Sequence, residues 1–422
     1  MKKLTAKGLA FVKKAVFNLI KAGEKAPAEQ EIPVRSPEEL KAEADRLKLL
    51  LQSQPEDVEA LYKLGEVYVE MARFGEAIAP LKEAVRLDPE PRAACFLLGR
   101  ACLEVGRDEE AIAALDEAGR MGEESEALKK LLAQAHTNLS ISLGRMGNHR
   151  EAFKEIKKAI QIIPNFGPAH LSMGVCYEEM GRYQEAMSKF DTALMMDARL
   201  IVDANYHYGL VYTKLKDYKK AIKHYQRAIA ESPTAAKPNL RLGLLYTKLK
   251  RYGEAIPFLE MALRRSPKLS PEAHYQLGLA YTTLNRYSDA VEPLRRAQKE
   301  NPDNEKILSM LAESLYQTSL TLNKPKEPEP ENLEVYEQEV ALLREAVFCN
   351  PRHSLAQYSL GRAYHCLALG YKALVHTVMA KQLFAQEHND EWLGRTMKDL
   401  QFFYKKYGYK PEEFAKIKVP GS

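Results

Sequence analysis

Apolar residues recur along most of the 422-residue chain with the spacing of paired helices. The stretch LGLLYTKLKRYGEAI at 242–256 returns as LGLAYTTLNRYSDAV from residue 277, 35 residues later. In each copy, Leu and Tyr four residues apart place one apolar stripe on a first helix, and Ala residues mark one face of a second helix. The pattern therefore predicts helical hairpins that repeat along the chain.

The same small residues mark nine successive hairpins. An Ala of the second helix recurs at steps of mostly 34 or 35 residues, as Ala84, Ala118, Ala159, Ala193, Ala228, Ala262, Ala297, Ala346 and Ala380. Nineteen residues before seven of these lies a Gly: Gly65, Gly99, Gly174, Gly209, Gly243, Gly278 and Gly361. Because one hairpin cannot bury its apolar face alone, we expect the hairpins to stack in a row.

This arrangement resembles the tetratricopeptide repeat (TPR), in which x-L-G-x-x-Y is followed by Ala, an aromatic residue or Leu, Ala and Pro within a unit of about 34 residues. The resemblance covers about residues 55–385 in nine units. It implies an all-α, right-handed superhelical solenoid of helix-turn-helix repeats with a concave inner face. The usual Trp of the first helix is replaced in every unit. His136, His170 and His274 stand there in three of them, and we interpret these as core or half-buried polar groups.

The segments between and before the repeats follow other patterns. Residues 24–36 carry two Pro and no apolar period, which predicts a linker. The sequence SPEE from Ser36 is a capping box with Pro at the first helical position, and it predicts an N-terminal capping helix over 37–54. The charged, Pro-rich insertion at 324–331 predicts a solvated loop, with a docking segment as the alternative.

Residues 386–422 predict a C-terminal capping helix and a tail. Apolar residues recur at steps of one, four, three and four, as Trp392, Leu393, Met397, Leu400 and Tyr404. We expect this stripe to cover the last repeat, and a partner site is the alternative.

Residues 1–23 predict a basic amphipathic helix. They hold six Lys and no acidic residue, whereas the other 399 residues sum to a charge of −1. On a helix, Lys3, Lys7, Lys14 and Lys21 share one face, and Val12 and Leu19 lie on the opposite side. Six uncharged residues in a row are too few to span a membrane. Three hypotheses remain for this segment: an anchor at an anionic membrane surface, docking on a protein (a partner or another copy), and a poorly ordered end.

Motifs that carry chemistry are missing from the sequence. There is no HExxH, no Cys/His set with metal spacing and no Gly-rich phosphate loop, and the repeats leave no room for a catalytic domain. The five Cys include no CxxC pair and indicate reduced core thiols of a cytoplasmic protein. A nearly neutral body also gives no basis for nucleic-acid binding. We therefore expect no enzymatic activity, no cofactor and no metal.

The resemblance also implies which positions face inward, namely three residues before and one residue after the Gly of each first helix. In units three to seven these inner-face positions are mostly apolar: Ile141, Leu171, Val175, Tyr206, Leu210, Leu240, Leu244, Tyr275 and Leu279. One interpretation is that they fill contacts between repeats. The other is an apolar groove that takes a hydrophobic helix or an extended segment.

Two cations beside this row match part of a binding site known from other members of the TPR family. Lys237 and Arg241 occupy the positions of the Lys and Arg of the carboxylate clamp, by which some members of the family grip the C-termini of chaperones. The clamp also needs Lys and Asn residues where Leu171, Val175 and His207 stand. Most of the clamp is therefore missing.

The sequence favours a scaffold that binds protein or peptide partners in its groove and is held peripherally at the inner face of a membrane by its N-terminal helix. The alternative is a structural protein whose N-terminal helix docks in the groove of a neighbouring copy, which would build homo-oligomers. A regulatory subunit of a separate enzyme is a third hypothesis.

Overall fold

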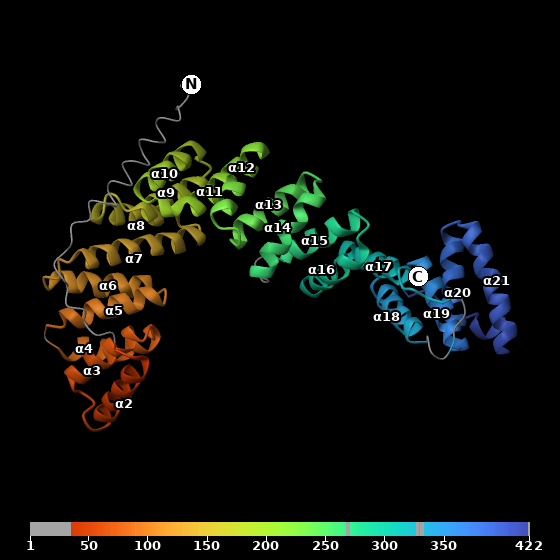
Figure 1. Ribbon diagram of the computed structural model, residues 1–422, viewed down its shortest axis with the longest axis horizontal. Coiled ribbons are helices and arrows are strands. Elements are labelled where there is room, and N and C mark those ends of the chain that lie inside the picture. The colour runs from red at the N-terminus through yellow and green to blue at the C-terminus, as the bar shows by residue number, and fades with distance from the viewer. Residues whose placement is uncertain (1–34, 89, 267–270, 326–328, 330–332, 421–422) are drawn as a thin grey trace, which may run out of the picture. The chain divides into compact units, whose positions relative to one another are not determined.

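The computed structural model describes residues 35–88, 90–266, 271–325, 329 and 333–420. These residues form twenty α-helices and short 3₁₀ turns, with no strand in the described parts (Figure 1). The chain divides into two compact units, Met1–Pro164 (unit 1) and Asn165–Ser422 (unit 2). The predicted all-α solenoid, with a capping helix at each end of the repeats, is confirmed.

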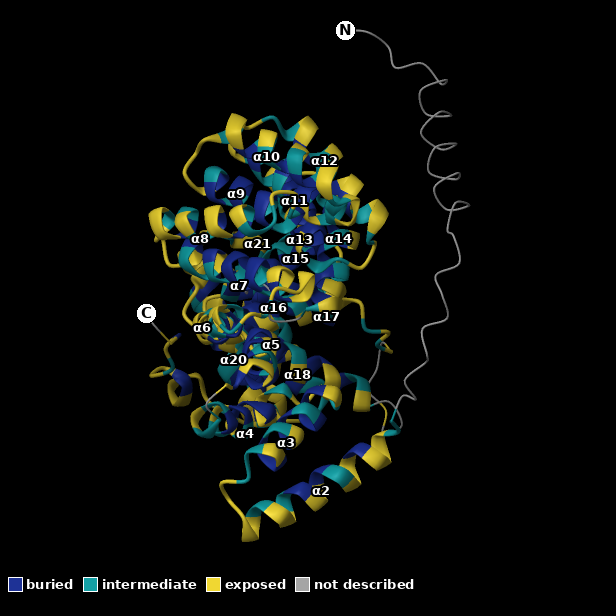
Figure 2. Cartoon of the chain, turned by 90° about the vertical axis from the view of Figure 1, so that its left-hand side faces the viewer, coloured by how far each residue is buried: buried dark blue, intermediate teal, exposed yellow. Residues whose placement is uncertain are grey.

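Unit 1 contains a capping helix and three hairpins. Its described helices are α2 (Pro37–Ser53), α3 (Val58–Glu70), α4 (Phe74–Leu87), α5 (Arg92–Glu104), α6 (Asp108–Arg120), α7 (Glu126–Arg145) and α8 (His149–Ile162). Consecutive helices pack side by side, first within a hairpin and then between neighbouring hairpins. Figure 2 shows the result on α2, where buried residues follow one face and exposed residues the other.

Unit 2 contains six hairpins and a second capping helix in its described residues. The helices of the hairpins are α9 (Gly167–Glu179), α10 (Tyr183–Met196), α11 (Ile201–Lys214), α12 (Tyr218–Glu231), α13 (Ala236–Lys248), α14 (Tyr252–Arg265), α15 (Pro271–Thr283), α16 (Tyr287–Glu300), α17 (Glu305–Leu320), α18 (Leu333–Cys349), α19 (Ser354–Cys366) and α20 (Gly370–Gln386). The capping helix is α21 (Asp390–Tyr407), and a 3₁₀ turn, η3 (Pro411–Phe414), follows it.

A close approach between two helices holds the Gly-containing hairpins together. The Gly of the first helix faces one side chain at a fixed position of the second helix, which is Leu, Phe, Tyr or Thr. A Cβ atom built on Gly243 would lie 2.7 Å from Cγ of Leu259 and 3.2 Å from its backbone nitrogen. Leu259 is fully buried, and Ala255 and Ala262 beside it are buried as well. Small residues on both helices therefore let the two backbones approach.

The turns between paired helices repeat a second set of contacts. Lys250 closes the turn after α13 with φ of 59°, and the next residue, Arg251, donates its N–H to the carbonyl of Tyr246 at 2.9 Å. This six-to-one bond is a Schellman-type helix end. The Arg251 guanidinium also lies 4.7 Å from the centroid of the Tyr246 ring. The same cation–π pair forms at 4.6 Å between Arg182 and Tyr177, so the Tyr of the repeat anchors the turn.

Polar side chains fill the position that Trp occupies in the usual repeat. His136, His170 and His274 are buried, which confirms their interpretation as core groups. Asn239 donates to the backbone carbonyls of Pro233 at 3.1 Å and Ala235 at 2.8 Å. These bonds tie the first helix to the loop before it, because a buried amide without partners would cost free energy.

In two hairpins, a histidine of the second helix pairs with the polar side chain that replaces the usual Trp of the first helix. The Nδ1 atom of His224 lies 2.9 Å from Asn205 Oδ1, and that of His376 lies 2.8 Å from Gln357 Oε1. Burial lowers the pKa of both His224 and His376 to about 4. Both imidazoles are therefore neutral at pH 7 and donate to the amide oxygens.

The two capping helices end the stack differently. The capping box of α2 is confirmed, since Glu39 N–H donates to Ser36 Oγ at 3.2 Å and Ser36 N–H to Glu39 Oε2 at 2.7 Å. On α21 the buried residues are Thr396, Leu400 and Phe403, whereas Met397 of the predicted stripe is exposed. Thr396 can face inward because its Oγ1 donates to the carbonyl of Trp392 at 2.7 Å.

The start of the Pro-rich insertion is held on α18. Lys324 Nζ lies 2.6 Å from Oε1 of the buried Glu339, and Tyr336 Oη donates to the carbonyl of Pro325 at 2.8 Å. Residues 326–328 and 330–331 of the insertion lie outside the described residues.

The close approach in the sixth hairpin predicts opposite effects for two Gly→Ala substitutions. Gly243→Ala places a methyl group against Leu259 and should lower the free energy of unfolding by about 1–3 kcal/mol. Gly253→Ala is the matched control, because no atom lies within 4 Å of a Cβ there, and it should raise that free energy by about 0.4–1 kcal/mol. Urea unfolding of both variants measures the difference. Equal shifts for the two would contradict the packing described above.

The buried histidines predict a loss of stability in acid. The unfolded chain binds protons to His224 and His376 near pH 6.5, but the folded chain does so only near pH 4, so stability is full above about pH 6.5 and falls as the pH drops through that window. Replacing His224 by Phe keeps an aromatic ring beside Tyr208 and removes one titrating group. Thermal melting at pH 7.5 and pH 5 should therefore show a smaller acid shift for His224→Phe than for the wild type. An unchanged shift would refute the assignment.

Candidate functional site

The predicted inner-face residues fall into both units. Ile141 lies on α7 in unit 1, where 39% of its surface is exposed. The other eleven predicted residues belong to α9, α11, α13 and α15 in unit 2, on four successive first helices. Because the repeats recur every 34 or 35 residues there, equivalent positions of neighbouring hairpins form a row.

Most members of this row are partly buried and partly open. Leu171 and Val175 pack against the apolar cluster around Phe190, and Tyr206, Leu210 and Leu244 pack against the larger cluster of unit 2. Tyr275 and Leu279 are also half-buried, and Leu240 is buried. These side chains therefore contact the core and still present part of their surface to solvent, and their use as a groove for a partner segment stays a prediction.

The two cations of the predicted site lie on the exposed surface of α13. Lys237 and Arg241 are exposed and form no ion pair with any residue that the structure describes. They lie four residues apart, which places them on one face of the helix beside Leu240 and Leu244. Unpaired cations next to half-open apolar side chains favour a ligand with acidic and apolar groups.

A buried carboxylate on α9 pairs with two polar side chains of α11. Glu178 is 3% exposed, and its two oxygens lie 2.9 Å from Nδ1 of His207 and 3.1 Å from Nζ of Lys214. A buried carboxylate is costly unless it is paired, so these contacts hold α9 against α11. His207 is therefore already engaged within the chain and is not available to a ligand carboxylate in this arrangement.

Sequence reasoning missed Glu178 and Lys214, although a signal for Glu178 exists. Four residues after the Gly, three successive repeats carry Thr213, Thr247 and Thr282, and the repeat before them carries Glu178. A Glu at a position where the next three repeats carry Thr indicates a contact that those repeats do not make. Its partner could not be identified from one sequence, because His207 lies 29 residues away.

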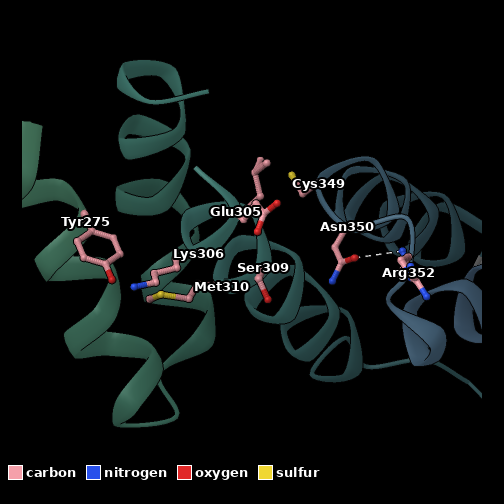
Figure 3. Close-up of a pocket in the computed structure, with 9 residues that line it drawn as sticks. Tyr275, Glu305, Lys306, Ser309, Met310, Cys349, Asn350 and Arg352 are labelled. Atoms are coloured by element: carbon pink, nitrogen blue, oxygen red, sulfur yellow. Dashed lines mark hydrogen bonds between the residues drawn. The ribbon is translucent and has the colours of Figure 1, made fainter. Parts of the chain in front are cut away.

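A cavity of about 670 Å³ lies next to the inner face of α15 (Figure 3). Its lining residues come from α15, α17 and the end of α18 with the loop that follows: Tyr275, Glu305, Lys306, Leu308, Ser309, Met310, Cys349, Asn350 and Arg352. In Figure 3 the side chains of Lys306 and Met310 point toward Tyr275. A volume in this range accommodates side chains of a bound segment, and Tyr275 connects the cavity to the inner-face row.

The described cysteines and histidines have the chemistry of core groups. Burial raises the pKa of the Cys176 and Cys349 thiols to about 11 and raises that of Cys366 as well, so all three are protonated at pH 7. His365, next to Cys366 in sequence, has its Nδ1 atom 2.8 Å from Tyr407 Oη. Among the described residues, no group of three or more His, Cys, Asp or Glu could hold a metal ion.

The predicted anchor lies outside the described residues, and this applies to Lys3, Lys7, Val12, Lys14, Leu19 and Lys21. Within the described part of the chain, every helix is too short or too polar to cross a membrane.

Family models match much of the chain. Models described as tetratricopeptide repeat match residues 133–166, 171–236, 212–275 and 248–314. A model described as anaphase-promoting complex, cyclosome, subunit 3 matches residues 44–118. No curated protein sequence matches the chain.

Solved structures are similar over parts of the chain. A MamA protein is 30% identical over 38% of this chain and 84% of its own, with a TM-score of 0.31. PilF of Pseudomonas aeruginosa is 17% identical over 54% of this chain and 96% of its own, with a TM-score of 0.40. YrrB, described as a TPR protein with an unusual peptide-binding site, is 21% identical over 46% of this chain and 96% of its own, with a TM-score of 0.34.

The helical hairpins of the described residues, most of them closed by a Gly against a side chain of the second helix, agree with the repeat models that match along the sequence. The chain belongs to the tetratricopeptide repeat family.

Proposed function

We propose that this chain is a protein–protein interaction scaffold, and that it holds a segment of a partner protein against the inner face of α11, α13 and α15. The observation that carries the proposal is the row of half-buried apolar side chains beside two cations that are unpaired within the described residues. Tyr206, Leu210 and Leu244 supply the apolar surface, and Lys237 and Arg241 supply the charge. TPR proteins bind protein or peptide partners, which agrees with this use of the surface.

The apolar and charged side chains of this surface indicate which residue types the bound segment carries. Leu210 and Leu244 occupy equivalent positions on α11 and α13, so apolar side chains of a partner can contact both in succession. Full burial of one Leu is worth about 1.5–3 kcal/mol, and only the part that is still open contributes on binding. An acidic group near Lys237 and Arg241 adds attraction and fixes the register. We therefore expect a segment with Leu or Phe and with Asp or Glu.

The function proposed is binding without catalysis. Membrane anchorage through residues 1–23, a peripheral cytoplasmic location and self-assembly of copies stay predictions of the sequence, because they depend on residues outside the described parts. None of them is required for the inner face of unit 2 to bind a partner.

Replacing two inner-face leucines tests the apolar contact. The probe is a fluorescent peptide selected from a displayed random library on the intact chain, and we expect the selected peptides to carry Leu or Phe with Asp or Glu. Leu210→Asp together with Leu244→Asp should raise the dissociation constant at least about a hundredfold, because two apolar contacts are lost and carboxylates face an acidic peptide. Fluorescence anisotropy measures the change.

The matched control is Leu215→Asp together with Leu284→Asp. These leucines are 44% and 42% exposed and lie at the ends of first helices, away from the inner-face positions. This variant should bind the peptide as the wild type does. If the inner-face variant bound normally, or if it lost as much stability as Gly243→Ala, the two leucines would be core residues only and the proposal would be wrong.

Reversing the charge of Lys237 and Arg241 tests whether the inner face prefers an acidic segment. Lys237→Glu with Arg241→Glu should weaken binding of an acidic selected peptide by about tenfold or more at low salt and by less at high salt, since salt screens exposed charges. Lys219→Glu with Lys223→Glu on α12 makes the same change of net charge on a second helix. An equal loss for both pairs would show that only the overall charge matters.

A further inference from the structure

A separate cavity of about 480 Å³ lies within unit 1, at the start of α3 and between α4 and α5. Its lining residues are Val58, Glu59, Tyr62, Ala84, Leu87, Asp88, Glu90, Ala93 and Ala94. Six of these nine are apolar or aromatic, the other three are carboxylates, and none is a cation. The cavity therefore offers an apolar interior with a negative rim.

The carboxylates of the rim are largely free to accept a ligand. Asp88 and Glu90 form no ion pair with a described residue, and the Oδ1 atom of Asp88 accepts the Glu90 N–H at 2.9 Å. Glu59 has one ion-pair partner among the described residues, Lys63, whose Nζ lies 2.6 Å away, and both side chains are at least half exposed. A cation that enters the cavity thus meets two unpaired carboxylates and a third held only by an exposed ion pair.

The cavity lies within a strongly acidic stretch of the chain. Residues 35–126 contain 22 Asp and Glu against 12 Lys and Arg, and residues 1–23 contain six Lys and no acid. The two stretches are close in sequence and opposite in charge. Residues 1–23 also have an apolar side by their sequence pattern, which matches the apolar interior of the cavity.

The connecting segment is long enough for the two to meet. Arg35 is fixed at the end of α3, because its guanidinium bonds Glu70 there and lies 2.5 Å from Glu43 of α2. The cavity lies at the other end of α3, about 16–18 Å away by the rise of a helix. The eleven residues that join residue 23 to Arg35 span up to about 40 Å when extended. A tether of this length gives a local concentration in the millimolar range.

We infer that the cavity of unit 1 takes residues 1–23 of the same chain, with apolar side chains inside and lysines against Glu59, Asp88 and Glu90. This goes beyond the proposed partner-binding function and does not depend on the inner face of unit 2. Docking covers the lysines and the apolar side of the segment, so the segment is withheld from an anionic surface until it leaves the cavity. The cavity is then an autoinhibitory site for the anchor.

Hydrogen exchange of the intact chain tests this assignment. Amides of residues 1–23 should be protected in the wild type at low salt. The variant Glu59→Gln, Asp88→Asn, Glu90→Gln keeps the side-chain shapes, and it should reduce that protection by about tenfold through the loss of three charge contacts. The control Glu104→Gln, Glu109→Gln, Asp116→Asn removes the same charge from α5 and α6 and should leave the protection unchanged. Circular dichroism checks that both variants stay folded.

Two further measurements distinguish docking within one chain from docking on a second copy, and test whether the cavity withholds the segment from a membrane. Protection should not change on tenfold dilution, since the contact is within one chain. Binding to vesicles of mixed phosphatidylcholine and phosphatidylserine should rise several-fold in the cavity variant and not in the control, because the segment is released. The inference is overturned by absent protection in the wild type, by protection that falls on dilution, which indicates a second copy, or by equal effects of the two variants. Vesicle binding that is the same for wild type and cavity variant would also overturn it.

Discussion

The close approach of a Gly on the first helix to a buried side chain on the second is the constraint on which the rest of the structure depends. At Gly209 and Gly243 the facing groups are Tyr225 and Leu259, and both are almost fully buried. With the two helices fixed at this distance, the Ala residues of the second helix and the polar side chains at the usual Trp position come into register. The hairpin then stacks on its neighbours as a rigid element, because its interior has no room to rearrange.

This rigidity leaves the inner-face positions free to differ from repeat to repeat. On α9 and α11, Glu178, His207 and Lys214 satisfy one another within the chain. One repeat further on, Lys237 and Arg241 have no such partner among the described residues. The same surface thus holds an internal ion-paired group next to unpaired cations. This contrast separates side chains that hold helices together from those that we propose contact a partner.

The hairpins were predictable from sequence because their determinants are local and regularly spaced. Gly243 contacts Leu259 of its own repeat, so the spacing of such residues indicates two helices and the contact between them. Contacts that depend on neighbouring elements were not predictable. The pairing of Glu178 with His207 and the cavity lined by α15, α17 and the end of α18 both arise from side chains of different hairpins. The division into two units also has no mark in the repeat pattern.

The central claim, that the inner face of unit 2 binds a partner segment, is tested most directly by hydroxyl-radical footprinting of the intact chain with and without the selected peptide. Tyr206 on α11 and Tyr275 on α15 should become protected on binding, because both are half-open inner-face residues. Met195 on α10 and Phe348 on α18 are strongly exposed elsewhere in unit 2 and should react as before. Protection of Met195 or Phe348 with Tyr206 and Tyr275 unchanged would contradict the account.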